Sequence, residues 1–289
     1  MKKGEVPLER AGLEDEGELL ETGRFVAENR GMAAEVRDYY HRILPFYDAE
    51  LRERGDEEFW ARMACDPPGC RVLELGAGTG RATEILARKA GRVVATELVP
   101  EMIAQARRKV GELPHVQLLV ADMRELSLRE RFELVVAVDD PFVHLTGDDD
   151  RDRAFRTAAG HLAPGGRFLL DAAWFPPGDR EEAADGLVKE HAAEDGRLCV
   201  REIWSCDPGT RLCSTRFEYR QAGELVEQAS FPGRLWSLDE LESRARSSGL
   251  RVSNLWGDYD LRPWNRDSSP RLIAELRRSY PSTGSARKR

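Results

Sequence analysis

One glycine-rich stretch constrains the fold of this chain more than any other feature. Residues Val72–Leu75 form a short, mainly apolar run, which is typical of a parallel strand buried on both faces. Glycines follow at alternate positions, at Gly76, Gly78 and Gly80, and a helical pattern begins directly after them. Glycine adopts backbone conformations that other residues avoid, and it lets a ligand approach the main chain closely. The stretch therefore predicts a buried strand, a tight turn and a helix, with space for a small cofactor against the turn.

The spacing of the glycines separates two kinds of cofactor site. Dinucleotides are bound by the pattern G-x-G-x-x-G, whereas this chain reads G-A-G-T-G and has an acid, Glu74, two positions before the first glycine. In this it resembles the class I S-adenosylmethionine-dependent methyltransferases, whose first motif is E/D-x-G-x-G-x-G. The resemblance implies that the turn lies beside the amino-acid part of S-adenosylmethionine. The cofactor-binding residues predicted from this motif are Glu74, Gly76, Ala77, Gly78 and Gly80.

A second acid has the position expected of a ribose ligand. Arg92–Glu97 reads as the second strand, and Glu97 at its end stands 21 residues beyond Gly76. In Rossmann-like sheets, an acid about 20 residues beyond the glycine turn accepts hydrogen bonds from ribose hydroxyls. The resemblance further implies that Leu98 and Met102, at the start of the next helix, flank the adenine. Met102 could equally be an ordinary core residue.

The third predicted strand, His115–Ala121, runs into Asp122 and Met123. This looks like the family's motif of a small residue, an aspartate and an apolar residue. The resemblance implies that the Asp122 carboxylate accepts a hydrogen bond from the adenine amino group, and that the next main-chain amide meets a ring nitrogen. The pairing is sensible because adenine offers a donor beside an acceptor. Asp122 could instead cap a turn.

The fourth predicted strand, Phe132–Val138, ends in Asp139-Asp-Pro-Phe-Val-His-Leu145. Ligands of open α/β sheets bind at the carboxyl ends of the strands, so this loop should face the transferred methyl group. Many small-molecule methyltransferases, among them the glycine N-methyltransferase group, carry N-S-F-x-H-L here. This chain keeps the Phe, His and Leu but has Asp140 and a proline in place of Asn-Ser. We assign Asp139 to the cofactor site.

Two residues of this loop are candidate catalytic groups. His144 can exchange a proton near neutral pH, and Asp140 can position it or attract a cationic amine. Methyl transfer needs mainly in-line alignment, so a base is optional when the acceptor is already nucleophilic. His144 could therefore be a structural residue.

Aromatic residues provide a candidate acceptor site. A helical pattern from Ala33, interrupted at Pro45, is typical of the lid that closes over the cofactor in the family the chain resembles. Residues 1–45 are thus expected to be an extension and a lid helix, with residues 1–30 loosely held and carrying at most one short helix. The predicted acceptor-binding residues are Tyr39, Tyr40, Tyr47, Phe142 and Trp174.

The α/β pattern continues to a fifth strand, and the predicted cofactor-binding core spans residues 46–175. Residues 176–235 then contain three alternating runs, which predict an antiparallel β insertion. The runs are Leu198–Cys206, Leu212–Arg220 and Glu224–Phe231. An insertion at this point could cap the acceptor or pair two subunits. Its layout resembles that of the sugar-amine N,N-dimethyltransferases of macrolide pathways.

The core pattern returns over residues 236–280, with a capping box at Ser237, a helix, the strand Leu250–Trp256 and a last antiparallel strand. Residues 281–289 form a basic tail that we expect to be disordered. The predicted fold is therefore α/β: a Rossmann-like, seven-stranded and mostly parallel sheet, with helices on both faces and an antiparallel insertion after the fifth strand.

The composition of the chain limits the kinds of partner that it is expected to bind. The formal net charge is −8, which argues against a protein that grips nucleic acid through a broad basic face. No apolar stretch suits a signal peptide or a membrane span, so we expect a cytoplasmic protein that binds no membrane. The cysteines, Cys65, Cys70, Cys199, Cys206 and Cys213, form no C-x-x-C pair, and neither a disulfide framework nor a metal site is expected.

We therefore predict an S-adenosylmethionine-dependent methyltransferase that acts on a nitrogen or oxygen of a small molecule, and that could form a homodimer. Three alternatives remain open. One is a nicotinamide-dependent oxidoreductase, which the glycine spacing and the lack of a Tyr-x-x-x-Lys pair disfavour. Another is a non-catalytic module that binds S-adenosylmethionine. The third is an arsenic or thiol methyltransferase that uses Cys199, Cys206 and Cys213, because thiolates suit soft ions.

Overall fold

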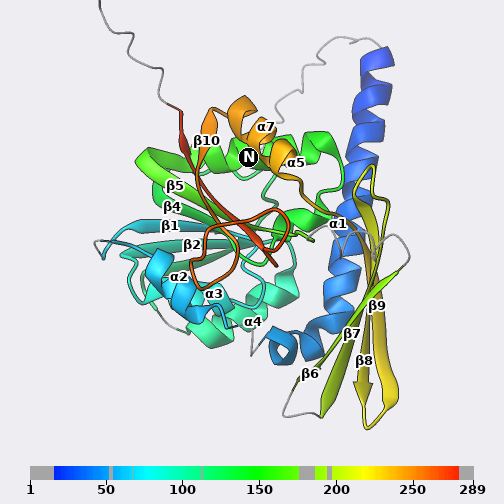
Figure 1. Ribbon diagram of the computed structural model, residues 1–289. Coiled ribbons are helices and arrows are strands. Elements are labelled where there is room, and N and C mark those ends of the chain that lie inside the picture. Colours follow the sequence, from blue (N-terminus) through cyan, green and yellow to red (C-terminus); the bar gives the residue numbers. More distant parts are fainter. Residues whose placement is uncertain are drawn as a thin grey trace, which may run out of the picture.

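The computed structural model shows a central sheet with helices packed around it and a second, smaller sheet beside it (Figure 1). The described residues are 16–51, 55–66, 68–111, 113–175, 186–193 and 197–279. The predicted tail, residues 281–289, lies outside these ranges.

Seven strands form the central sheet, in the order β10, β11, β5, β4, β1, β2, β3. Their bounds are β1 Arg71–Leu75, β2 Arg92–Glu97, β3 Val116–Val120, β4 Phe132–Ala137, β5 Leu162–Ala172, β10 Leu250–Trp256 and β11 Leu272–Arg278. All are parallel except β11, which is antiparallel to both of its neighbours. The predicted Rossmann-like, mostly parallel sheet is confirmed.

Helices cover both faces of this sheet. Their bounds are α2 Glu57–Met63, α3 Arg81–Ala87, α4 Pro100–Val110, α5 Asp148–His161 and α7 Leu238–Ser247, with a 3₁₀ turn, η1, at Pro141–His144. Side chains alternate along β1, so Leu73 and Leu75 join the core that contains α5 and α7, while Val72 joins the core that contains α2 and α3. Because helices occupy both faces of the sheet, a ligand can bind only at the edge, where the carboxyl ends of the strands lie.

A four-stranded antiparallel sheet forms the insertion, in the order β6, β7, β8, β9. Its strands are β6 Leu187–Ala193, β7 Leu198–Cys206, β8 Leu212–Gln221 and β9 Glu224–Arg234. This small sheet confirms the three predicted runs, but β6 was missed because its sequence shows no clear alternation of apolar and polar residues. In Figure 1 the small sheet stands beside the helix α1, Glu16–Leu51.

The helix α1 differs from the prediction in two ways. It begins at Glu16, where a loosely held extension was expected, and it continues through Pro45, where an interruption was expected. A proline inside a helix removes one backbone hydrogen bond and costs about 3 kcal/mol. Burial of Tyr39 and Ile43 against the small sheet offsets this cost, because tertiary packing supplies most helical stability in proteins.

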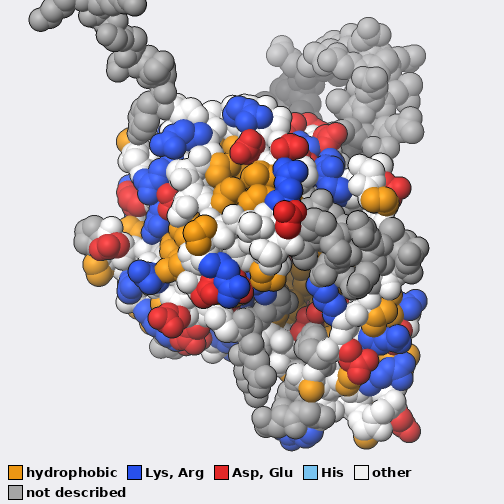
Figure 2. All heavy atoms as spheres, viewed as in Figure 1, with side chains coloured by type: hydrophobic (Ala, Val, Ile, Leu, Met, Phe, Trp, Pro, Cys, Tyr) orange, Lys and Arg blue, Asp and Glu red, His pale blue; other side chains and the backbone are white. Residues whose placement is uncertain are grey.

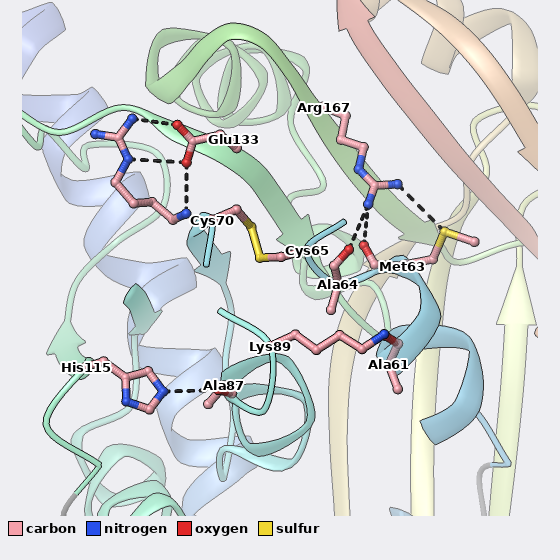
Figure 3. The surroundings of a disulfide bond; sticks show 11 residues. Ala61, Met63, Ala64, Cys65, Cys70, Ala87, Lys89, His115, Glu133 and Arg167 are labelled. Carbon is pink, nitrogen blue, oxygen red and sulfur yellow. Dashed lines mark hydrogen bonds and ion pairs between the residues drawn. A yellow bond between two sulfur atoms is a disulfide. The ribbon is translucent and has the colours of Figure 1, made fainter. Parts of the chain in front are cut away.

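A disulfide bond joins Cys65, just after α2, to Cys70, just before β1 (Figure 3). Near it, Arg167 of β5 donates hydrogen bonds to the main-chain oxygens of Met63 and Ala64. The end of α2 is thus attached both to the first strand and to β5. We expected no disulfides, and this expectation was wrong because the sequence does not show that the chain turns back between the two cysteines.

A second disulfide joins Cys206 and Cys213, which face each other across β7 and β8. Cys199 lies at the other end of β7, opposite Arg220, and is not in a disulfide. The structure therefore does not gather the three thiols of the predicted arsenic or thiol site. The seven-residue spacing reflects the register of one hairpin, which places only Cys206 and Cys213 side by side. Within the described ranges, no three His, Cys, Asp or Glu side chains are grouped so that they could hold a metal ion.

Basic and acidic side chains are interspersed over the face shown in Figure 2, and neither sign forms a broad patch there. Among the described helices, none combines the length and the apolar character needed to cross a membrane.

Candidate active site

The glycine turn after β1 has a different neighbour at each glycine. All three glycines have positive φ, between 54° and 83°. A Cβ on Gly76 would lie 2.3 Å from the Cβ of Pro141, and a Cβ on Gly78 would lie 3.1 Å from the hydroxyl of Tyr47. The turn is therefore compressed between η1 and α1, and only residues without a side chain fit both the space and the backbone conformation.

Gly80 has a purely structural neighbour. A Cβ there would lie 2.9 Å from the Cβ of Ala106 on α4, so this glycine permits close packing of α3 against α4. It lines neither of the two larger cavities described below. The geometry therefore does not support the predicted contact between Gly80 and the cofactor, because the chain passes into α3 at this position.

Glu97, at the end of β2, holds the glycine turn from the other side. One carboxylate oxygen accepts a hydrogen bond from the main-chain amide of Gly78, and the other accepts one from that of Val99, both at 3.0 Å. Burial raises the pKa of Glu97, and the hydrogen bonds from the Val99 and Gly78 amides oppose this rise. The acid that was predicted from spacing alone therefore lies against the turn.

These residues border a cavity that we call the glycine-loop cavity. Its floor consists of residues at the carboxyl ends of β1 to β4, and Val36, Tyr40 and Tyr47 of α1 form its roof. Eight of the predicted cofactor-binding residues line it: Gly76, Gly78, Glu97, Leu98, Met102, Asp122, Met123 and Asp139. Glu74 and Ala77 line a smaller cavity beside the same turn.

Asp122 has a strong partner within the protein. Arg124 donates to both of its carboxylate oxygens, with its Nη2 at 2.6 Å from one of them. Burial raises the pKa of Asp122, but the hydrogen bonds from Arg124 outweigh this and hold the pKa below its usual value. The carboxylate therefore remains an ionised acceptor in the wall of the glycine-loop cavity.

Glu74 is fully buried and accepts a hydrogen bond from the hydroxyl of Thr83 at 2.6 Å. Burial raises its pKa from the usual 4.5 to about 7. A carboxyl group whose pKa is higher in the folded protein stabilises the fold less as the pH rises from the unfolded pKa through the folded pKa. Glu74 should therefore destabilise the protein above pH 7 relative to pH 5.

We expect Glu74→Gln to stabilise the protein more at pH 8 than at pH 5, by about 3 kcal/mol at most. Glutamine is neutral at both values, whereas the buried glutamate must ionise as the pH rises. Urea unfolding of both proteins at the two pH values measures the difference. An equal effect of the substitution at pH 5 and pH 8 would show that Glu74 does not titrate between them.

A second cavity, which we call the aromatic cavity, lies between the carboxyl edge of the central sheet, α1 and the small sheet. Its volume of about 390 Å³ is within the range of small-molecule pockets. The aromatic side chains that line it are Tyr39, Tyr40, Tyr47, Trp174, Phe175, Trp204, Phe217 and Phe231. Four of these are residues predicted to bind the acceptor: Tyr39, Tyr40, Tyr47 and Trp174.

Charged side chains line the aromatic cavity as well. Acids outnumber bases: Glu50, Asp139, Asp140, Asp171 and Glu202 against Lys189 and Arg271. Asp171, at the end of β5, accepts a hydrogen bond from the hydroxyl of Tyr259 at 2.7 Å. Sequence reasoning missed Asp171, although an acid at the end of an apolar strand was a usable signal. It also missed Trp204, Phe217 and Phe231, because alternation marks them only as the buried face of a sheet.

Four residues line both cavities and lie where the two meet: Tyr40, Tyr47, Asp139 and His144. The hydroxyl of Tyr40 lies 2.8 Å from Nε2 of His144. His144 is 6% exposed, and burial lowers its pKa from 6.5 to about 4, so the imidazole is neutral at pH 7. Its Nδ1 is buried without a hydrogen-bond partner among the described residues. A neutral imidazole with one unused nitrogen therefore stands between the cavities.

The two other predicted residues of this loop have different surroundings. Phe142 is fully buried and packs against Phe155, Phe168 and Trp236. It lines neither cavity, so the geometry does not support the predicted contact with the acceptor. The reason is the 3₁₀ turn, which directs Phe142 into the core and His144 toward the cavities.

Asp140 is 5% exposed, and its two carboxylate oxygens accept hydrogen bonds from three protein N–H groups. Burial raises its pKa to about 7, although the amide of Ala173 opposes this. A carboxylate occupied in this way is poorly placed to act on a substrate. The geometry does not support the prediction that Asp140 is catalytic.

A family model and several known proteins match this chain. Residues 72–166 match a family model described as a methyltransferase domain. The chain is 30% identical over 187 residues to the dTDP-3-amino-3,6-dideoxy-alpha-D-glucopyranose N,N-dimethyltransferase of Streptomyces fradiae, an overlap of 62% of this chain and 70% of the relative. It is also 30% identical over 196 residues to the dTDP-3-amino-3,4,6-trideoxy-alpha-D-glucopyranose N,N-dimethyltransferase of Streptomyces venezuelae, covering 66% of this chain and 79% of the relative.

Among solved structures, the CcbJ methyltransferase from Streptomyces caelestis superimposes with a TM-score of 0.67. The two chains are 25% identical, and the match covers 78% of this chain and 94% of that one.

Proposed function

Because the chain belongs to the class I S-adenosylmethionine-dependent methyltransferases, we propose that it methylates an amine nitrogen of a small molecule held in the aromatic cavity. One observation carries this proposal. The glycine-loop cavity and the aromatic cavity share four lining residues, so ligands in the two cavities would meet beside Tyr40, Tyr47, Asp139 and His144.

The residues of the glycine-loop cavity fit S-adenosylmethionine. Gly78 has no side chain, so a ligand can approach its main chain closely. The buried carboxylate of Glu97 lines the same cavity. Glu97 would accept hydrogen bonds from ribose hydroxyls. Asp122 and the amide of Met123 would hold the adenine edge, with Met102 against its face. When bound, S-adenosylmethionine supplies an electrophilic methyl group on a sulfonium.

The chemistry of the aromatic cavity favours an amine over a neutral hydroxyl. Carboxylates from α1, β5 and β7 face a cavity with several aromatic rings, and both features attract an ammonium group. The names of two relatives specify N,N-dimethylation of amino sugars. An amino sugar is therefore the first acceptor to test.

An amine attacks only after it loses its proton. The carboxylates would draw the ammonium form into the cavity, and His144, neutral at pH 7, can accept a hydrogen bond or a proton from it at the wall between the cavities. Tyr40 would fix the orientation of the imidazole through its hydroxyl. Alignment alone can lower the barrier by about 7 to 11 kcal/mol in favourable cases, so the main task of these residues is to hold the acceptor in line.

The proposal is tested by incubating the protein with methyl-labelled S-adenosylmethionine and pairs of acceptors that differ only in an amino or a hydroxyl group at one position. We expect label on the amine of amino sugars and none on the matched alcohols. Transfer to the alcohols, or only to thiols, would overturn the assignment to nitrogen.

We expect Glu97→Ala to weaken binding of S-adenosylhomocysteine by about 10- to 100-fold, since hydrogen bonds to charged groups are each worth about 1.5–3 kcal/mol. The substitution also removes the acceptor of the Gly78 amide, so affinity alone does not place the ribose. Calorimetry with S-adenosylhomocysteine and its 2′,3′-dideoxy analogue separates the two effects. The wild type should prefer the hydroxylated ligand and the variant should not; an unchanged preference would mean that Glu97 does not bind the ribose.

We also propose that the chain divides into a core at residues 46–175, an insertion at 176–235 and a return to the core at 236–280. We propose further that the protein is cytoplasmic, has no nucleic-acid partner and forms a homodimer through the small sheet.

A further inference from the structure

The insertion that carries the small sheet is joined to the core through a narrow neck. The chain enters the insertion after Ala173 and returns at Trp236, and the main-chain amide of Trp236 donates to the oxygen of Ala173 at 2.9 Å. Both ends of the insertion are thus tied to each other. The small sheet supplies Trp204, Phe217 and Phe231 to the aromatic cavity. The position of these three side chains, which we call the aromatic wall, therefore depends on how the neck is held, as well as on the packing of the small sheet against α1.

Asp140 holds this neck against the loop that carries His144. Its Oδ2 accepts hydrogen bonds from the amide of Ala173 at 2.6 Å and from the indole Nε1 of Trp236 at 3.0 Å. Its Oδ1 accepts one from the amide of Phe142 at 3.1 Å. One buried carboxylate therefore connects the start of the insertion, its end and η1.

Arg151 of α5 makes a second connection between the same segments. Its guanidinium lies 3.9 Å from the ring centre of Trp236, and its Nε donates to the oxygen of Leu145, directly after η1, at 2.8 Å. Its Nη2 donates to the main-chain oxygen of Arg234, at the end of β9. Trp236 thus contacts both Asp140 and Arg151. Each of these two residues is also hydrogen-bonded to the main chain of the loop that carries His144.

The chemistry of this position requires a carboxylate. The three groups around Asp140 are all N–H donors, and a carboxylate, the form that Asp140 takes above its pKa of about 7, accepts at both of its oxygens. An asparagine would direct an NH₂ group at one or two of these donors, and a buried donor would lose its partner.

We propose that Asp140 is a positioning residue, which acts through Ala173 and Trp236 to set the distance between the aromatic wall and His144. The inference rests on the proposed function insofar as the aromatic cavity holds the acceptor. It also replaces the catalytic role expected for Asp140, because the carboxylate acts on the protein rather than on the reacting atoms.

Steady-state kinetics of Asp140→Asn, Trp236→Phe and the double variant test the proposal. We expect the acceptor kcat/KM to fall about 10- to 30-fold in Asp140→Asn and about fivefold in Trp236→Phe, because small misplacements of reacting groups are costly. The affinity for S-adenosylhomocysteine should stay within about twofold. The double variant should be no worse than Asp140→Asn by more than about twofold, since both substitutions break the same hydrogen bond.

Trp60→Phe is the matched control, because the indole N–H of Trp60 also donates to a buried carboxylate, that of Asp56 at 3.1 Å, and Trp60 lines neither cavity. It should keep the acceptor kcat/KM within about twofold. Wild-type kinetics in Trp236→Phe, or fully additive losses in the double variant, would overturn the proposal. An equal loss of cofactor affinity in the single variants would also overturn it, since it would indicate general disruption.

Amide hydrogen exchange provides a test that needs no turnover. Asp140→Asn should speed exchange at the amides of Phe142 and Ala173 at least about tenfold, while the amides of β1 keep their protection. If Asp140→Asn does not fold, the Ala173 amide is followed in Trp236→Phe. A wild type that transfers no methyl group would contradict the proposed function but leave this test valid, and unchanged exchange would contradict the role of Asp140 whatever the activity.

Discussion

Gly78→Val should reduce the affinity for S-adenosylmethionine about 10- to 100-fold. Gly78 lines the glycine-loop cavity with φ of +54°, and a Cβ there would already lie 3.1 Å from the hydroxyl of Tyr47. A valine adds two further methyl groups in the space that the cofactor needs and is strained at positive φ. The strain costs about 1–3 kcal/mol of folding stability, and the obstruction costs about 1–3 kcal/mol of binding free energy. Calorimetry with S-adenosylmethionine and S-adenosylhomocysteine measures the loss.

Gly111→Val separates strain from obstruction. Gly111 follows α4 with φ of +58°, and nothing lies within 4 Å of the Cβ it would gain. This variant should lose about 1–3 kcal/mol of stability from the same backbone strain and keep the affinity for the cofactor. If Gly78→Val bound S-adenosylmethionine as tightly as Gly111→Val does, the cofactor would not lie against the glycine turn.

His144→Ala should lower kcat about 10²- to 10³-fold and leave the affinity for S-adenosylhomocysteine within about twofold. The size follows from the usual contribution of a positioned acid or base. The affinity should survive because the predicted contacts to ribose and adenine come from Glu97 and Asp122, on other strands. Single-turnover measurements at saturating cofactor give the chemical step directly.

His115→Ala is the matched control for this variant. His115 precedes β3, and its Nε2 lies 3.1 Å from the main-chain oxygen of Ala87 (Figure 3). It lines neither the glycine-loop cavity nor the aromatic cavity. Its replacement should leave kcat unchanged. Full activity in His144→Ala would make His144 part of the cavity wall only, and alignment would then account for the rate.

The pH dependence of kcat adds a further check on His144. Burial places its pKa at about 4, below the usual 6.5. A base with a lowered pKa stays neutral and able to accept a proton down to that value, and loses this ability as the pH falls through it. Activity should therefore show no titration of His144 between pH 6 and pH 8, and an apparent pKa near 6.5 that disappears in His144→Ala would contradict the described burial.

The cofactor half of the site was largely predictable from the sequence. Gly78, Glu97 and Asp122 each lie at or shortly after the end of a predicted strand. In a parallel sheet the carboxyl ends of adjacent strands meet at one edge, so residues at those ends must gather. The structure places all three in one cavity. Gly80 was the exception, because its spacing fits the motif but its neighbour is Ala106 of α4.

The aromatic cavity was predictable only where its lining comes from α1 and from the end of β5. Tyr40 and Trp174 could be named, but Trp204 and Phe231 come from the small sheet, and their place in the cavity depends on how that sheet docks against α1. Asp140 illustrates the same limit. Its type and position suggested catalysis, whereas its role depends on Trp236, which is 96 residues away in the chain.

By itself, the sequence determined the succession of features along the chain: a glycine turn, acids at successive strand ends and an antiparallel insertion. These features indicated the fold and the cofactor class. Only the tertiary structure decided which aromatic side chains line the aromatic cavity, that Phe142 lies in the core, that Cys206 meets Cys213, and that Asp140 binds the neck of the insertion. The reason is physical. Strand and turn patterns are local and periodic, whereas register, docking and the direction of a side chain in a 3₁₀ turn are set by contacts between residues far apart in the chain.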